Sequence, residues 1–298
     1  GSGTPSVLKG HDGPVVSAAW SPDGKRIVTA SQDRTARVWQ ANGTGTPSVL
    51  RGHVGAVVSA AWSPDTARIV TASADKTARV WQANGTGTPS VLKGHHDEVV
   101  SAAWSPDGKR IVTASRDKTA RIWRADGTGT PSVLKGHEDE LVTAAWSPDG
   151  KHIVTTSKDN TARIWRADGT GKPRVLGGHH DEVVSAAWSA DSKRIVTTSK
   201  DNTARIWQAE GTCTSVLRGH QDTVVSAAWS PDGKRIVTAS NDKTARVWQV
   251  DGTPTPSVLK GHKDTVVSAA WSPDGKRVVT ASADETARVW KMDSGGAP

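Results

Sequence analysis

The sequence predicts an all-β fold of seven similar four-stranded antiparallel sheets that close into a ring. One unit, containing Gly-His, Ala-Ala-Trp-Ser, Ser-x-Asp and Thr-Ala-Arg-Val/Ile-Trp, occurs seven times along the 298 residues. The Gly-His histidines recur every 42 residues, with one step of 41. Each unit also consists of short apolar runs separated by turn residues, which is typical of strands.

The first repeat shows why each element is expected. Residues 15–20 form a short apolar run, and Ser21-Pro22-Asp23-Gly24 is a tight-turn signature that joins it to a second strand at 26–31. A short turn then leads to 35–39, where polar and apolar residues alternate with a period of two. A looser Gly-rich connection precedes a fourth, outer strand at 48–50.

The ends of the chain predict how the ring closes. A four-stranded sheet of this size has two apolar faces, so neighbouring sheets are expected to stack face to face around an axis. The chain starts with a fourth-strand sequence at residues 4–8 and ends before the last repeat has one. We therefore expect the N-terminal strand to complete the last sheet of a single domain, 1–298. The repeats are placed at approximately 10–51, 52–93, 94–135, 136–177, 178–218, 219–260 and 261–298 plus 1–9.

Composition narrows the classes of protein. The chain contains no Phe or Tyr, and its fourteen Trp occupy two fixed positions of the repeat, where we expect them all to pack. No apolar stretch reaches the roughly 18 residues that suggest a membrane span. Cys213 is the only cysteine, so no internal disulfide is possible. These features predict a cytoplasmic protein without membrane association.

The repeated motifs resemble those of the WD-repeat β-propeller family over essentially the whole chain, and the near-identity of the copies resembles highly repetitive bacterial arrays. The resemblance rests on Gly-His, Ser-Pro-Asp-Gly, Ser-x-Asp and the final Trp of each repeat. It implies a seven-bladed β-propeller, each sheet being one blade. The Asp that follows Trp in the family is replaced here by Gln40, Gln82, Arg124, Arg166, Gln208, Gln249 and Lys291.

The resemblance also implies a buried hydrogen-bond network in each blade. Asp accepts from the His ring, the second His nitrogen accepts from the Ser hydroxyl, and the Ser oxygen accepts from the Trp N–H. A hydrolase triad would use the same residue types, but an active site is normally singular and these sets occur seven times, so we expect no enzyme. The network residues are His11, Ser31, Asp33, Trp39, His53, Ser73, Asp75, Trp81, His95, Ser115, Asp117, Trp123, His137, Ser157, Asp159, Trp165, His179, Ser199, Asp201, Trp207, His220, Ser240, Asp242, Trp248, His262, Ser282, Asp284 and Trp290.

Metal and cofactor sites are not predicted. Two repeats read Gly-His-His-Asp-Glu, with the His-His-Asp-Glu part at 95–98 and 179–182. No further ligands stand beside these residues, and stable zinc sites need three or four. The Gly-Thr-Gly-Thr stretches precede an outer strand rather than a helix, unlike a phosphate-binding loop. We therefore expect neither a metal nor a cofactor.

The repeats differ mainly just after Gly-His and around Ser-x-Asp. In a WD-repeat propeller these loops share one face, the usual binding face, although neutral drift on exposed loops would also produce such variation. Repeats three to five carry basic residues beside acidic ones, either to contact a charged partner or to pair with one another. The candidate binding residues are His96, Glu98, Arg116, Glu138, Glu140, Lys158, His180, Glu182 and Lys200.

Charge argues against a nucleic-acid partner on this face. The net charge is +8 overall, but the variable loops hold eight basic and eleven acidic residues, or −3, and no aromatic residue on which a base could stack. We predict a monomeric, noncatalytic scaffold that binds a protein or peptide through these loops. The alternative is a purely structural or engineered repeat propeller with no selected ligand.

Overall fold

The computed structural model describes residues 7–250 and 256–292. These residues form strands, turns and loops, with no helix among them. They divide into two compact units, 1–136 and 137–298. Across both units there are seven antiparallel sheets, which confirms the all-β, seven-bladed prediction; six sheets have four strands and the last has three.

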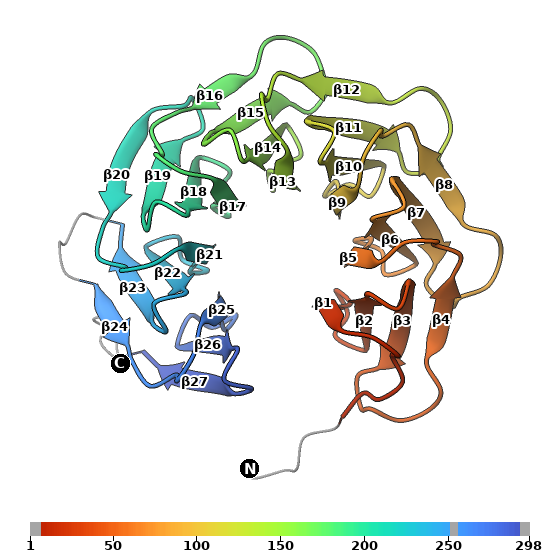
Figure 1. The fold of residues 1–298 in the computed structure, drawn as a ribbon, viewed down its shortest axis with the longest axis horizontal. Coiled ribbons are helices and arrows are strands. Elements are labelled where there is room, and N and C mark those ends of the chain that lie inside the picture. Colours follow the sequence, from red (N-terminus) through yellow and green to blue (C-terminus); the bar gives the residue numbers. More distant parts are fainter. Residues whose placement is uncertain (1–6, 251–255, 293–298) are drawn as a thin grey trace. The chain divides into compact units, whose positions relative to one another are not determined.

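Unit 1 contains three sheets of four strands each, drawn from red to yellow-green in Figure 1. In each sheet, neighbouring strands in the sequence are neighbours in space. The strands are β1 (Val15–Trp20), β2 (Arg26–Ser31), β3 (Thr35–Gln40), β4 (Ser48–Arg51), β5 (Val57–Trp62), β6 (Arg68–Ser73), β7 (Thr77–Gln82), β8 (Ser90–Lys93), β9 (Val99–Trp104), β10 (Arg110–Ser115), β11 (Thr119–Arg124) and β12 (Ser132–Lys135).

Unit 2 contains the other four sheets, with the same strand order. Its strands are β13 (Leu141–Trp146), β14 (His152–Ser157), β15 (Ala162–Arg166), β16 (Arg174–Leu176), β17 (Val183–Trp188), β18 (Arg194–Ser199), β19 (Ala204–Gln208), β20 (Cys213–Leu217), β21 (Val224–Trp229), β22 (Arg235–Ser240), β23 (Ala245–Gln249), β24 (Ser257–Leu259), β25 (Val266–Trp271), β26 (Arg277–Ser282) and β27 (Ala287–Lys291).

The last sheet, β25–β27, is the one for which the sequence predicts a fourth strand from the N-terminus. Most of that segment, residues 1–6, lies outside the described residues, and residues 7–9 lie outside any strand. Ring closure by residues 1–9 and the single domain 1–298 therefore stay predictions.

The turn between the first two strands of a sheet has the geometry that its sequence predicts. In the first repeat, the N–H of Gly24 donates to the carbonyl of Ser21 at 2.8 Å. Gly24 has φ +68°, in the left-handed region that glycine occupies without strain. Asp23 accepts from the backbone N–H of Lys25, and the N–H of Arg26 donates to Ser21 Oγ at 2.9 Å. The turn thus satisfies its own polar groups and sets the hairpin register.

The core of each unit lies between successive sheets. In unit 1, Val28 and Leu50 of the first sheet pack with Val57, Trp62 and Ile69 of the second, all nearly inaccessible to solvent. The other clusters repeat this pattern between the second and third sheets of unit 1 and within unit 2. A two-faced sheet is stable only when both faces are covered, so stacking supplies what a single blade lacks.

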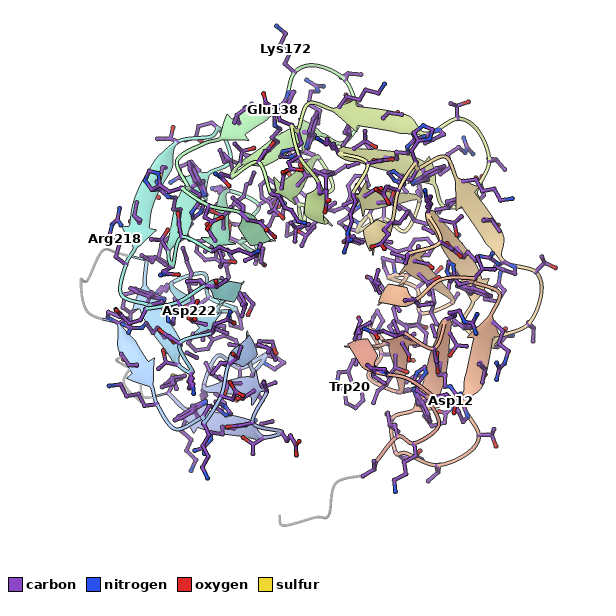
Figure 2. All side chains as sticks on the ribbon, viewed as in Figure 1. Asp12, Trp20, Glu138, Lys172, Arg218 and Asp222 are labelled. Carbon is purple, nitrogen blue, oxygen red and sulfur yellow. The ribbon has the colours of Figure 1, made fainter. Side chains whose placement is uncertain are left out.

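One tryptophan departs from the expectation that all of them pack. Trp62 is buried and its Nε1 donates to the carbonyl of Ala19 in the preceding sheet at 3.1 Å. Trp20, labelled in Figure 2, holds the same repeat position but is 60% exposed. It belongs to the first sheet of unit 1, and no earlier sheet in that unit offers it a partner.

Candidate functional site

The variable loops lie together at one end of the strands in each unit. Antiparallel order places the Gly-His loop, before the first strand of a sheet, beside the Ser-x-Asp turn that joins the second and third strands. A backbone hydrogen bond joins the two loops, from the N–H of Arg116 to the carbonyl of Glu98 at 3.0 Å. We call this end of the sheets the loop face. Asp12 in unit 1 and Glu138 and Asp222 in unit 2 mark it in Figure 2.

A hydrogen-bond chain lies beneath the loop face in every repeat. In the second repeat, Trp81 Nε1 donates to Thr71 Oγ1 at 2.8 Å, and His53 Nε2 lies 2.8 Å from the same hydroxyl. His53 Nδ1 lies 2.7 Å from Asp75 Oδ2. Because an ionised carboxylate only accepts, Nδ1 carries the proton and the Thr hydroxyl donates to Nε2. The order of donation is therefore Trp to Thr to His to Asp.

The hydroxyl in this chain corrects one expectation. The resemblance assigns it to Ser31 and its equivalents, but the structure places a threonine two residues earlier on the same strand. Trp39 lies opposite Ile27, so Thr29 is its diagonal neighbour on one face of the sheet, while Ser31 lies a further step of about 7 Å along the strand. The seven threonines are Thr29, Thr71, Thr113, Thr155, Thr197, Thr238 and Thr280.

The serines hold the turn instead. Ser73 Oγ donates to the carbonyl of Gly55 at 3.1 Å and accepts from the backbone N–H of Asp75. The sequence carried a signal for the threonine, since Ile/Val-Val-Thr is present in every repeat. It was missed because residue type alone does not distinguish two hydroxyls on one strand face.

Burial and hydrogen bonding set the charge states of the network. Burial lowers the pKa of His95, although the hydrogen bond to Asp117 opposes that effect, so the ring is neutral near pH 7. Burial raises the pKa of Asp117, but hydrogen bonds from Thr119, His96 N–H and His95 outweigh it and hold that pKa at about 2. The third repeat thus holds a neutral imidazole against an ionised carboxylate.

In six of the seven repeats, the Gly of the Gly-His pair allows the chain to pass close to a third-strand arginine. Gly52 has φ +151°, and a Cβ at that position would lie 2.6 Å from Arg79 Nη1. Any side chain there would displace the guanidinium, which packs beside the Trp81 ring at 6.0 Å. This close approach explains why Gly precedes His.

The arrangement favours a structural role for the network over a catalytic one. Thr71, the hydroxyl that faces the imidazole, is fully buried and already accepts from the indole. A nucleophile must reach its substrate, and this hydroxyl has no path to solvent. Within residues 7–250 and 256–292, no group of three or more metal-ligating side chains converges.

The basic candidate residues on the loop face are each paired with an acidic one in the same repeat. In unit 1, Arg116 Nε lies 3.2 Å from Glu98 Oε2. In unit 2, Lys158 Nζ lies 2.7 Å from Glu140 Oε2, and Lys200 Nζ lies 2.8 Å from Glu182 Oε2. The basic side chains remain between 41% and 47% exposed.

The remaining candidates lie at the tips of the Gly-His loops. His96 in unit 1 and Glu138 and His180 in unit 2 are exposed. Their backbone N–H groups donate to the network carboxylates Asp117, Asp159 and Asp201 at 2.9–3.0 Å. The buried network therefore holds the backbone that presents these side chains.

Comparison with known proteins agrees with this geometry. A TolB β-propeller domain model matches residues 3–176, and a WD domain G-beta repeat model matches 171–208, 211–249 and 254–291. The chain belongs to the WD-repeat β-propeller family. Proteins of this family generally act as noncatalytic scaffolds that bind proteins or peptides.

The chain is similar to curated proteins over a stretch as long as one repeat. An "mRNA export factor" is 43% identical over 42 residues in Danio rerio, in Mus musculus and in Bos taurus. The match covers 14% of this chain and 11% of each of those proteins. The matched stretch of 42 residues has the length of one repeat. No helix in the described part of this propeller is long and apolar enough to cross a membrane.

Proposed function

We propose that this propeller is a noncatalytic interaction scaffold that binds a protein or peptide through its loop face. The observation that carries the proposal is the set of charged pairs restricted to three repeats: Glu98–Arg116, Glu140–Lys158 and Glu182–Lys200. The other repeats have Pro, Ala or Thr at the Glu position and Gln, Ala or Asn at the basic position.

The pairs suit recognition better than they suit stability. Exposed ion pairs contribute only about 0–1 kcal/mol to folding, so they explain little of the stability of a blade. A binding protein with a complementary charge pattern can replace one member of such an ion pair at a small cost in free energy. Charge complementarity also raises the specificity and the rate of association.

We infer that the partner is a polar, charged segment, and that the scaffold acts as a monomer. We place it in the cytoplasm, consistent with a single, exposed cysteine.

A displayed peptide library tests the loop face directly. Peptides selected on the wild-type chain would be titrated against the variant Arg116→Glu, Lys158→Glu, Lys200→Glu. Reversing these three charges should weaken binding at least about tenfold, since each charged contact is worth about 1 kcal/mol or more.

A control on the other end of the strands separates recognition from net charge. Lys25→Glu, Lys234→Glu, Lys276→Glu changes the net charge equally, but in the hairpin turns opposite the loop face. Peptides that bind this control as well as the wild type, and not the loop-face variant, support the proposal. Equal binding to both variants would contradict it.

The internal pairing also supports the alternative of a structural or engineered repeat without a selected ligand. If the pairs serve only to satisfy one another, the selected peptides will show no common sequence. In that case, no loop-face substitution will change binding. The same library therefore distinguishes the two functions.

A further inference from the structure

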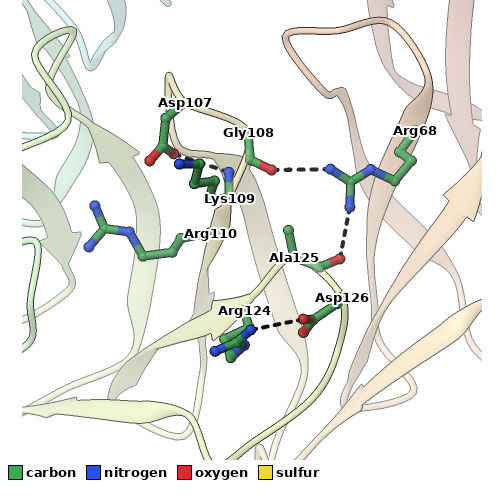
Figure 3. A pocket seen from close by; sticks show the side chains of 8 residues that line it. All are labelled: Arg68, Asp107, Gly108, Lys109, Arg110, Arg124, Ala125 and Asp126. Atoms are coloured by element: carbon green, nitrogen blue, oxygen red, sulfur yellow. Dashed lines mark hydrogen bonds and ion pairs between the residues drawn. The ribbon is translucent and has the colours of Figure 1, made fainter.

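A charged pocket opens in unit 1, between the sheet β5–β8 and the sheet β9–β12, at the strand ends opposite the loop face. Its volume is about 570 Å³, within the range of small-ligand sites. Figure 3 shows its lining, which consists of Arg68, Asp107, Gly108, Lys109, Arg110, Arg124, Ala125 and Asp126.

Arg68 is held in place across this pocket by uncharged groups of the next sheet. Its guanidinium donates to the carbonyls of Gly108 and Ala125 in the next sheet, at 3.1 Å each (Figure 3). It also lies over the Trp104 ring, 4.7 Å from the ring centre. The neutral carbonyls fix the position of the cation, and Asp65 offsets part of its charge through an electrostatic interaction, so the guanidinium is a positioned donor for an anion.

The two carboxylates of the pocket are already engaged in their own turns. Asp107 accepts from the hydroxyl of Ser105 and from the backbone N–H of Lys109. Asp126 accepts from the side chain and backbone of Thr128, and it pairs with Arg124 at 3.2 Å. Four cations against two carboxylates leave a net charge of +2 on the lining.

The Arg124–Asp126 pair is open to exchange. The two side chains are 70% and 49% exposed, and exposed pairs of this kind are weak. An incoming oxyanion can therefore share Arg124 without a large loss elsewhere. Arg provides a planar guanidinium with several N–H donors, and Lys provides a compact ammonium charge. Both groups bind phosphate oxygens well.

Unit 2 contains a matched pocket that lacks the decisive arginine. It lies between the sheets β17–β20 and β21–β24, has a volume of about 480 Å³, and is lined by Arg194, Asp232, Gly233, Lys234, Gln249 and Val250. Arg194 again donates to the carbonyl of the turn glycine, Gly233. At the position of Arg124, however, this repeat has Gln249.

We propose that the pocket around Arg68, Lys109 and Arg124 binds a small phosphate-bearing polyanion. The site is distinct from the loop face and does not depend on the function proposed for it. Arg68 provides the fixed charge, and Arg124 and Lys109 approach from the two loops of the neighbouring sheet.

Calorimetric titration with sodium tripolyphosphate tests the proposal on the complete chain at about 0.15 M salt, where unspecific surface attraction is screened. The wild type should bind one equivalent. Arg124→Gln should weaken binding about tenfold, the loss expected for one charge-assisted contact. Gln is the residue that four other repeats carry at this position, and a melting curve checks that the variant folds.

Lys109→Gln and Lys234→Gln form a matched pair, since both remove one lysine from the same turn position in different repeats. The first should weaken binding, and the second should leave it within about twofold. The proposal is overturned if the two variants lose affinity equally, if Arg124→Gln binds as the wild type does, or if the wild type does not bind below about 1 mM.

Discussion

Thr71 lies between two buried nitrogen atoms, and its single hydroxyl satisfies both. It accepts from Trp81 Nε1 and donates to His53 Nε2, at 2.8 Å each. Buried polar groups without hydrogen-bond partners lower the free energy of unfolding, so this one hydroxyl stabilises the indole and the imidazole as well as its own side chain. At this scale the threonine, and not the serine, links strand to loop.

Thr71→Val keeps the shape of the side chain and removes the hydroxyl. It should destabilise the protein by about 2–4 kcal/mol, because the imidazole and the indole each lose a buried partner. Chemical denaturation monitored by tryptophan fluorescence would measure the loss. A loss below about 1 kcal/mol would show that the hydroxyl is not the central group.

Thr198→Ala is the contrasting change. Thr198 is fully buried, and its Oγ1 has no hydrogen-bond partner within the described residues. Five other repeats carry Ala at this position. Removing the hydroxyl should therefore be neutral or stabilising by up to about 1 kcal/mol, and a large loss would reveal a bond that the geometry does not contain.

Thr66 has a strained backbone in the turn that follows β5. Its φ is +61°, where a β-branched residue is disfavoured by about 1–2 kcal/mol, and five other repeats have Gly at this position. Thr66→Gly should raise the stability by about 1 kcal/mol, measured as a higher denaturation midpoint. The reverse change, Gly24→Thr, should lower it similarly, because no atom lies within 4 Å of a Cβ there and only backbone strain is added.

Between elements, an arginine at the start of the second strand bridges successive sheets. Arg26, Arg68, Arg194 and Arg235 lie over a tryptophan of the next sheet at 4.5–4.9 Å. Each also donates to a backbone carbonyl there. Stacking and hydrogen bonding by one side chain thus align each blade with its neighbour.

His152 occupies this position in unit 2 and makes a weaker bridge. Its ring stacks on Trp188 at 6.2 Å but makes no hydrogen bond that the structure records. His152→Arg should stabilise the chain by about 0.5–1.5 kcal/mol by restoring the cation–π contact and the carbonyl bond. Arg68→His should give the opposite change, and equal melting temperatures for both variants would contradict the bridging role.

For the whole molecule, the repeated network predicts that the free energy of unfolding decreases in two stages as the pH is lowered from 7 to 2. Burial lowers the pKa of His53, His95, His179 and His220, so the unfolded chain binds more protons than the folded one below about pH 6.5. The pKa values of Asp117 and Asp201 are about 2, so their contribution is complete above about pH 4. It is lost as the pH falls toward 2. Melting temperatures measured from pH 7 to pH 2 should show both declines, and a constant value between pH 7 and pH 5 would contradict the buried neutral histidines.

The bounds of the elements were largely predictable from the sequence. The strands expected at 15–20, 26–31, 35–39 and 48–50 correspond to β1, β2, β3 and β4. Such patterns are local, because alternation, turn residues and repeat length depend on neighbours a few residues apart. The number of near-identical repeats, seven, then predicted the number of blades.

The atomic pairing was decided only by the tertiary structure. Three features depend on distances across strands or between sheets: the role of Thr29 rather than Ser31 in the network, the pairing of Arg116 with Glu98, and the pocket around Arg68. A strand pattern determines which face a residue occupies but not which of two hydroxyls on that face meets an indole from the next strand. The sequence by itself determined the architecture of the blades, and register and sheet packing decided which polar groups meet.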